Sequence, residues 1–147
     1  MKTQLLDQAG ERRTYAVVLE TGDEVMSCLS AFAREEDLDS AQITGIGAFS
    51  DASLQYFCWK TKKYVEIPVD HQVEVAALVG DVALSPKGDP AVHLHVVLGD
   101  KDGSAMAGHL GKAHVRPTLE VIVTEAPSYL RKAIDPESGL ALIRPAE

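Results

Sequence analysis

The chain has 147 residues, of which 46% are hydrophobic and 24% are charged, and these ordinary globular values exclude a wholly disordered protein. Its formal net charge of -8 gives an average field that repels nucleic-acid backbones and anionic membranes. No apolar run reaches the length of a membrane span, and the N-terminus lacks a secretory signal pattern. We expect one cytoplasmic domain over residues 1–147, with the isolated Cys28 and Cys58 as reduced core thiols.

The first predicted elements are a strand over residues 14–20 and a helix over residues 23–36. The strand is β-branched and apolar, and it ends where Thr21 and Glu24 have the spacing of a capping box. The apolar residues that then repeat at helical spacing are Val25, Leu29, Phe32 and Ala33. They make one apolar face, so this is the long helix of the chain.

After the helix, short apolar segments alternate with turn residues up to about residue 125. The strands predicted there cover residues 42–49, 53–59, 64–68, 73–84, 92–99, 105–110 and 115–125. The tail adds a short helix at 128–133 and a strand at 140–144. Because no further helices are available as crossovers, we predict an α+β fold in which one main helix covers a mostly antiparallel sheet.

Three histidines have positions that a hairpin can bring together. His93 and His95 are two apart in a predicted strand, so their side chains share one face. Whether His109 joins them depends on the turn between the two strands. The number of residues in the turn therefore decides whether two or three histidines share one face.

Two turns are compatible with the glycines of this hairpin. In one, residues 101–103 form a three-residue loop with Gly103 in the left-handed conformation, and His95 then lies opposite His109. In the other, a tight two-residue turn pairs His95 with Leu110, and His109 points to the other side of the sheet. We favour the first turn, because the second places Leu110 rather than a polar group beside two histidines.

Three converging neutral imidazoles suit zinc, nickel, cobalt or copper, and they leave one coordination position open for water or a substrate. We predict a divalent transition metal, with zinc as the first choice, on His93, His95 and His109. The alternative is three partly buried strand histidines with ordinary hydrogen bonds. His71 and His114 are interpreted as surface residues or as residues that support a ligand.

Two other segments carry polar chemistry. Arg116, Thr118 and Glu120 alternate with apolar residues, so they share one face of a strand. Glu120 is the candidate catalytic residue, which could orient a ligand histidine or accept a proton from bound water, or could instead form an ion pair with Arg116. Residues 56–64 mix aromatics with Lys60, Lys62 and Lys63, which suits single-stranded nucleic acid or, as we favour, a hairpin end with core aromatics and exposed lysines.

The segments TGIGAFSDASLQYF, VALVGDVALSPKGDPAVHLHVVLGDKDGSAMAGHL and VRPTLEVIVTE together resemble the plant-and-prokaryote conserved (PPC) domain in its stand-alone prokaryotic form. The His-x-His strand, the Asp-Gly turn and the Gly-His-Leu that follows carry the resemblance. It covers about residues 12–126 and makes 127–147 a C-terminal extension. It implies a largely antiparallel α+β fold, a homotrimer and a metal on His93, His95 and His109.

In plants, the domain that this chain resembles is attached to AT-hook DNA-binding motifs and mediates assembly. This chain has no Arg-Gly-Arg-Pro hook, so that route into the minor groove is missing. We therefore expect a metal-binding homotrimeric domain with a regulatory or assembly role, associated with DNA weakly or through partners and not with membranes. The alternative is a metal-dependent enzyme that acts on a small molecule at the three-histidine site.

Overall fold

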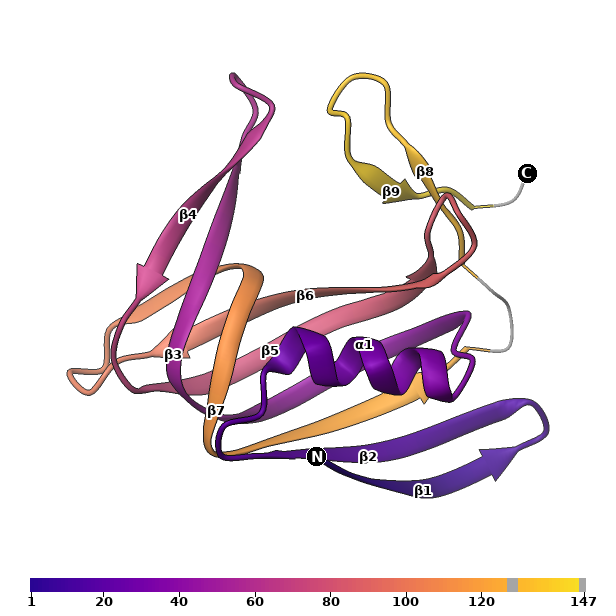
Figure 1. The fold of residues 1–147 in the computed structure, drawn as a ribbon, viewed down its shortest axis with the longest axis horizontal. Coiled ribbons are helices and arrows are strands. Elements are labelled where there is room, and N and C mark those ends of the chain that lie inside the picture. The colour runs from indigo at the N-terminus through magenta and orange to yellow at the C-terminus, as the bar shows by residue number, and fades with distance from the viewer. Residues whose placement is uncertain (127–129, 146–147) are drawn as a thin grey trace.

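The protein is described by a computed structural model that covers residues 1–126 and 130–145 (Figure 1). The elements in chain order are β1 Lys2–Ala9, β2 Arg12–Glu20, α1 Val25–Glu35, β3 Ser40–Cys58, β4 Lys63–Val69, β5 Val73–Leu84, β6 Pro90–Gly99, β7 Ala105–Glu125, β8 Lys132–Ile134 and β9 Ala141–Ile143. Within the described residues α1 is the one helix, and the predicted α+β class is confirmed. This helix also lacks the length and apolar character needed to cross a membrane.

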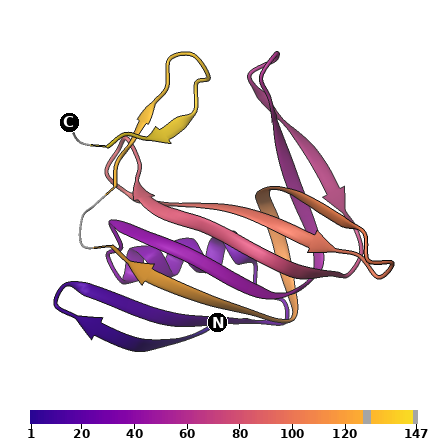
Figure 2. The same ribbon diagram turned by 180° about the vertical axis from the view of Figure 1, so that it is seen from behind.

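The main sheet has seven strands in the order β1-β2-β7-β6-β5-β3-β4. Its ladders are antiparallel, as predicted. Because β7 also pairs with β3, the strands β3, β5, β6 and β7 form a closed ring of pairings. The β1–β2 hairpin extends this ring on one side, and β4 extends it along the outer half of β3 (Figures 1 and 2).

Two strands are much longer than predicted. β3 has 19 residues and β7 has 21, whereas the sequence predicted two separate strands in each place, and the predicted breaks are wrong. The ladder between β3 and β7 shifts register at Gly47/Phe49, Phe49/Asp51 and Ser53/Leu54. Such irregularities bend a strand without ending it, so the polar residues near position 51 mark a bend rather than a turn. Both strands curve strongly in Figure 1.

Helix α1 buries the four predicted residues, Val25, Leu29, Phe32 and Ala33, against the sheet. Its N-terminus differs from the prediction, because Glu24 itself is the cap. The Glu24 carboxylate accepts hydrogen bonds from the N–H groups of Met26 at 3.1 Å and Ser27 at 2.8 Å. The Thr21 hydroxyl instead donates to the carbonyl of Pro117 at 3.2 Å, so the predicted capping box is wrong.

The chain ends add two hairpins. β1 was not predicted, because all eight of its residues are exposed and no buried face leaves an alternating pattern. At the other end, Lys132 begins β8, so the helix predicted for 128–133 is wrong from there on; positions 128 and 129 lie outside the described residues. The strand predicted at 140–144 is confirmed as β9. The β8–β9 and β3–β4 hairpins project from the same side of the sheet (Figures 1 and 2).

Both cysteines are free, as predicted, but they are only half-buried and do not belong to the innermost core. Cys28 lies on α1 and Cys58 lies at the last residue of β3. The core itself is mostly aliphatic and is enclosed by α1 and the inner face of the ring, with Phe49, Leu94 and Leu110 among its fully buried side chains.

Candidate metal centre

The β6–β7 turn has the three-residue form that the sequence favoured. The Asp100 N–H donates to the Ser104 carbonyl at 2.8 Å, and the Gly103 N–H donates to the Asp100 carbonyl at 2.9 Å. Gly103 has a φ of 82°, which a residue with a side chain rarely adopts. His95 consequently pairs with His109 across the two strands, and the predicted register is confirmed.

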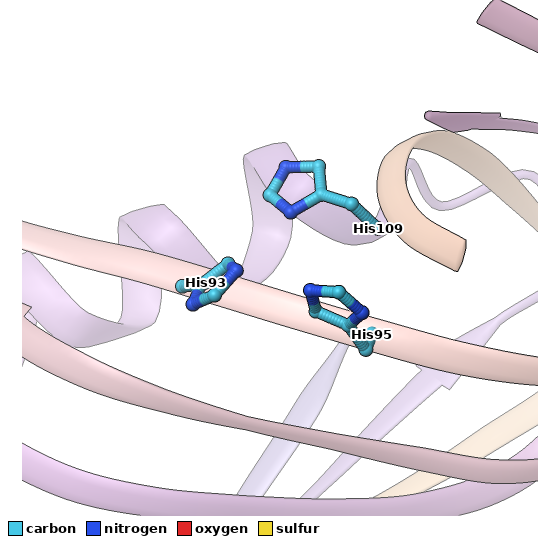
Figure 3. A group of neighbouring side chains, drawn as sticks. All are labelled: His93, His95 and His109. Atoms are coloured by element: carbon cyan, nitrogen blue, oxygen red, sulfur yellow. The ribbon is translucent and has the colours of Figure 1, made fainter. Parts of the chain in front are cut away.

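This register brings the imidazoles of His93, His95 and His109 together on one face. One ring nitrogen from each residue lies within 4.8 Å of those of the other two. The ring centroids are 5.0 to 5.4 Å apart. Figure 3 shows one nitrogen of each ring turned toward the space between the rings. Within residues 1–126 and 130–145, this is the one group of three or more potential ligand residues with such spacing.

The arrangement of the three histidines fits a metal ion. Nδ1 of His109 is buried and has no hydrogen-bond partner, which is costly for an imidazole nitrogen unless something else binds it. A tetrahedral ion with nitrogen bonds of about 2.0 to 2.1 Å needs ligand nitrogens roughly 3.4 Å apart. The three nitrogens lie within 4.8 Å of one another, and neutral imidazole is a common zinc ligand, so the donor set suits zinc or a similar ion.

The pKa values of two of the histidines are shifted in the direction that ligation needs. Burial, followed by repulsion from His93 and His95, lowers the pKa of His109 from 6.5 to about 4. Burial and the charge of His93 also lower the pKa of His95. Because only the neutral imidazole offers a free lone pair, these shifts keep protons from competing with a metal near neutral pH.

The sequence analysis missed an aspartate that contacts His93 and a lysine that contacts this aspartate. Asp81 of β5 pairs with His93 of β6, and its Oδ2 atom lies 3.4 Å from Nδ1 of His93. The Nζ atom of Lys132 lies 3.1 Å from the other carboxylate oxygen. Burial opposes ionisation of Asp81, but the contacts with His93 and Lys132 outweigh it and lower its pKa. A carboxylate at Nδ1 favours the tautomer that leaves Nε2 of His93 for a ligand.

The histidines open into a cavity of about 500 Å³. Its walls come from the β3–β4 hairpin, from β6 and β7, and from the C-terminal β8–β9 hairpin. The larger apolar and aromatic side chains that line it are Tyr56, Phe57, Tyr64, Val92, Leu140 and Leu142. The ring of Tyr64 lies 5.2 Å from that of His109, so the aromatic wall directly adjoins the candidate ligands.

The remaining predicted polar residues lie elsewhere. His71 is exposed and pairs with Asp100 at 2.7 Å, while His114 contacts Asp51 at 2.8 Å, and neither belongs to the three-histidine group. Glu120 pairs with Val18 and Ile46 in the sheet and lines a different hollow. The structure of one chain therefore does not bring Glu120 together with the histidines.

The lysine and aromatic run forms the end of the β3–β4 hairpin, as favoured. Lys60, Lys62 and Lys63 are exposed, and the Nζ atom of Lys62 lies 3.0 Å from the centre of the Trp59 ring. The expectation of core aromatics is wrong, because Tyr56 and Trp59 are also exposed. The hairpin extends beyond the ring of strands, so its aromatic side chains pack on one another rather than in the core.

The sheet, helix α1 and the histidine group together define a small α+β domain with a candidate metal centre between two adjacent strands. A family model for the Plants and Prokaryotes Conserved (PCC) domain matches residues 6–127, and the chain belongs to this family. The resemblance stated from the sequence is thereby confirmed.

Solved structures of similar proteins support this assignment. A PPC protein from Pyrococcus horikoshii has a TM-score of 0.84 and 30% identity, covering 96% of this chain and 99% of that chain. The metal-containing protein of Archaeoglobus fulgidus has a TM-score of 0.83 and 29% identity, with 99% and 100% covered. A candidate DNA-binding protein from Bacteroides thetaiotaomicron has a TM-score of 0.83 and 29% identity, with 94% of both chains covered.

A curated relative places a similar segment in a longer protein. The chain is 29% identical over 133 residues to the bifunctional protein GlmU of a Synechococcus strain. The match covers 88% of this chain but only 20% of GlmU, so the two proteins share one segment.

Proposed function

We propose that this chain is a metal-binding PCC domain that forms a homotrimer and has a regulatory or assembly role. The observation that carries the metal proposal is the convergence of three imidazoles around a buried, unpartnered nitrogen of His109. The similar Archaeoglobus fulgidus protein is named as metal-containing, which supports it. Zinc is the first candidate for the metal. The proposed location is the cytoplasm, since two free cysteines fit a reducing compartment.

The chain's own residues would perform distinct tasks in this centre. His93, His95 and His109 would hold the ion, and Asp81 would orient His93 through Nδ1. A bound zinc would supply an open coordination position with Lewis-acid character. The cavity of about 500 Å³ beside the histidines gives a small ligand access to that position.

Metal analysis of purified protein tests the proposal directly. We expect close to one transition-metal ion per chain in the native protein. His95→Ala should lose the ion, because two imidazoles rarely hold it alone, whereas His71→Ala should retain it, because His71 pairs with Asp100 away from the site. Full metal retention after simultaneous replacement of His93, His95 and His109 by alanine would refute the site.

The homotrimer is supported by an apolar face of the sheet that one chain leaves uncovered. Ile46, Val79 and Ile122 are 61%, 52% and 41% exposed and surround a hollow of about 520 Å³. Ile122 alternates with the buried Val121 and Val123, so it points away from the core that α1 covers. Contiguous exposed apolar surface of this kind marks association sites.

Light scattering tests this assembly, and we expect three times 15.8 kDa. Ile122→Glu should dissociate the assembly, because it would place a charge in the apolar hollow. Val65→Glu is the matched control, since Val65 is similarly exposed but lies on β4, outside that hollow. A native monomer at micromolar concentration would contradict the trimer.

DNA association by this chain would be weak or would require partners. The similar Bacteroides protein is a candidate DNA-binding protein, which favours some association. However, a trimer would carry three times -8, or -24, formal charges. Duplex affinity comes largely from counterions that lysine and arginine release at phosphates. The exposed Lys60, Lys62 and Lys63 offset this negative charge only locally.

The cavity favours one alternative, a metal-dependent enzyme that acts on a small molecule. Enzymes need a defined pocket at the open metal position, and the histidines open into one. No aspartate or glutamate is among the described residues that line it, so a separate carboxylate base is missing within one chain. We therefore rank the binding and assembly role first.

A further inference from the structure

The C-terminal β8–β9 hairpin lies beyond the family match, which ends at residue 127, yet it forms a wall of the metal-site cavity. Its contribution consists of Lys132, Leu140, Ala141 and Leu142. The Leu84 N–H donates to the Leu130 carbonyl at 2.7 Å and attaches the hairpin to the end of β5. The hairpin is therefore part of the site.

The turn of this hairpin is fixed by its own hydrogen bonds. One carboxylate oxygen of Asp135 accepts from the N–H and the hydroxyl of Ser138 at 2.8 and 2.7 Å. The other oxygen accepts from the Arg144 guanidinium at 3.1 Å. A hairpin braced in this way holds Lys132 at a defined place in the cavity wall.

Lys132 is the one lysine among the described residues that line the cavity. Its side chain is only 8% exposed, and no other lysine and no arginine, aspartate or glutamate is among the described residues of the lining. Asp81 lies behind it and is not part of the lining. The ammonium group has three N–H donors, and its contact with one oxygen of Asp81 leaves donors for a ligand.

The charges around the cavity therefore favour an anion. Three neutral imidazoles do not compensate the two positive charges of a bound divalent ion, and the Lys132–Asp81 pair is neutral as a whole. A carboxylate has two acceptor oxygens, so it can take up the open metal position and also accept a hydrogen bond from Lys132. The aromatic and aliphatic walls, formed by residues such as Tyr64 and Leu142, suit an apolar body on that carboxylate.

We propose that the cavity binds small carboxylates with an apolar body, and that Lys132 of the C-terminal hairpin selects the negative charge. This inference rests on the proposed metal function. It assigns a ligand class to the site and a recognition role to a segment outside the family match.

The test uses the full chain loaded with Co²⁺, whose visible absorption reports on its ligands. Benzoate and benzamide serve as probes, because they have nearly the same shape and differ in charge. We expect benzoate to change the spectrum saturably and to bind at least about 10-fold more tightly than benzamide. Lys132→Met should weaken the binding of benzoate by about 10- to 100-fold, as expected for loss of a charged hydrogen bond, and should leave the affinity for benzamide unchanged. Lys62→Met is the control, since Lys62 is exposed and outside the cavity lining, and it should bind benzoate normally.

The outcomes separate the two proposals. Absence of a Co²⁺ spectrum in the native protein would overturn the metal function and this inference with it. A normal Co²⁺ spectrum with equal affinities for benzoate and benzamide would overturn the carboxylate inference alone. If Lys132→Met does not fold or does not hold Co²⁺, Lys132→Arg decides the role of the charge. This variant should keep benzoate binding within about 10-fold and should keep the preference over benzamide, and loss of that preference would refute the role of the charge.

Discussion

Replacing Gly80 by alanine should damage the fold and the histidine site together. Gly80 of β5 pairs with Leu94 of β6, next to His93. A Cβ atom at position 80 would lie 2.0 Å from the His93 carbonyl oxygen and 2.7 Å from a methyl group of Leu94. Both separations are far below ordinary van der Waals contact of about 3.5 Å or more. The two strands must therefore move apart by roughly 1 Å or more at this pair, since a backbone oxygen cannot rotate away.

Overpacking of this kind costs about 1 to 3 kcal/mol, and we expect Gly80→Ala to lower the free energy of unfolding by about the upper figure. The movement also displaces His93 relative to His109. Metal sites tolerate errors of only about 0.5 Å, so metal affinity should fall at least about 10-fold. Urea unfolding of the metal-free protein and competition with a chelator measure the two effects separately.

Gly99→Ala is the matched control for this experiment. Gly99 of β6 is likewise a strand glycine and pairs with both β5 and β7. However, the nearest atom to a Cβ added at Gly99 is the Cβ of Glu74 at 3.9 Å, which is an ordinary contact. Its unfolding free energy should change by less than about 1 kcal/mol. If Gly80→Ala is as stable as Gly99→Ala and binds metal as tightly, the close approach of β5 and β6 has been misjudged.

Three further predictions follow from charges. In the metal-free protein, the folded pKa of His109 is about 4 and the unfolded value about 6.5, so the unfolded state binds more protons between them. Stability should be intact above pH 6.5 and decline as the pH falls toward 4, and His109→Asn should flatten that decline in urea titrations at several pH values. Arg13→Met should cost about 1 to 3 kcal/mol in urea unfolding, because it leaves Glu125, which is 12% exposed, without the guanidinium at 2.7 Å. Lys2→Met, which removes the exposed Lys2–Glu20 pair, should leave the unfolding curve nearly unchanged. In fluorescence anisotropy at physiological salt, the dissociation constants for random and AT-rich duplexes should be about 10⁻⁶ M or larger. Nanomolar, sequence-dependent binding would make DNA recognition the primary function.

The parts of the fold that sequence predicted well are those whose pattern is local. Helix α1 has a continuous apolar face, and β5 is bounded by clear turn residues, so its predicted range of 73–84 agrees with Val73–Leu84. β3 and β7 were divided because polar and glycine residues interrupt their apolar runs. Whether such residues form a turn or a bend depends on the strand across the ladder, and that partner lies about 60 residues away in sequence, as for Ser53 and Lys112. A single-strand pattern does not contain this information.

The same distinction separates the predicted and missed parts of the candidate site. His93, His95 and His109 lie on one hairpin, so strand alternation and the length of one turn suffice to place them together. Asp81 comes from β5 and contacts His93, and Lys132 comes from beyond β7 and contacts Asp81, so both depend on contacts between segments that are distant in the sequence.

These long-range residues nevertheless determine the chemistry that the histidines can support. Asp81 favours one tautomer of His93, and Lys132 adds N–H donors for an anion to a cavity wall that is otherwise largely apolar. PCC domains that share the histidine hairpin but differ in the segment after residue 127 should therefore hold the same metal and differ in the ligands they accept. That expectation can be checked by comparing benzoate binding between Co²⁺-loaded proteins of this family with and without a lysine at the position of Lys132, and equal affinities would argue that the hairpin only closes the cavity.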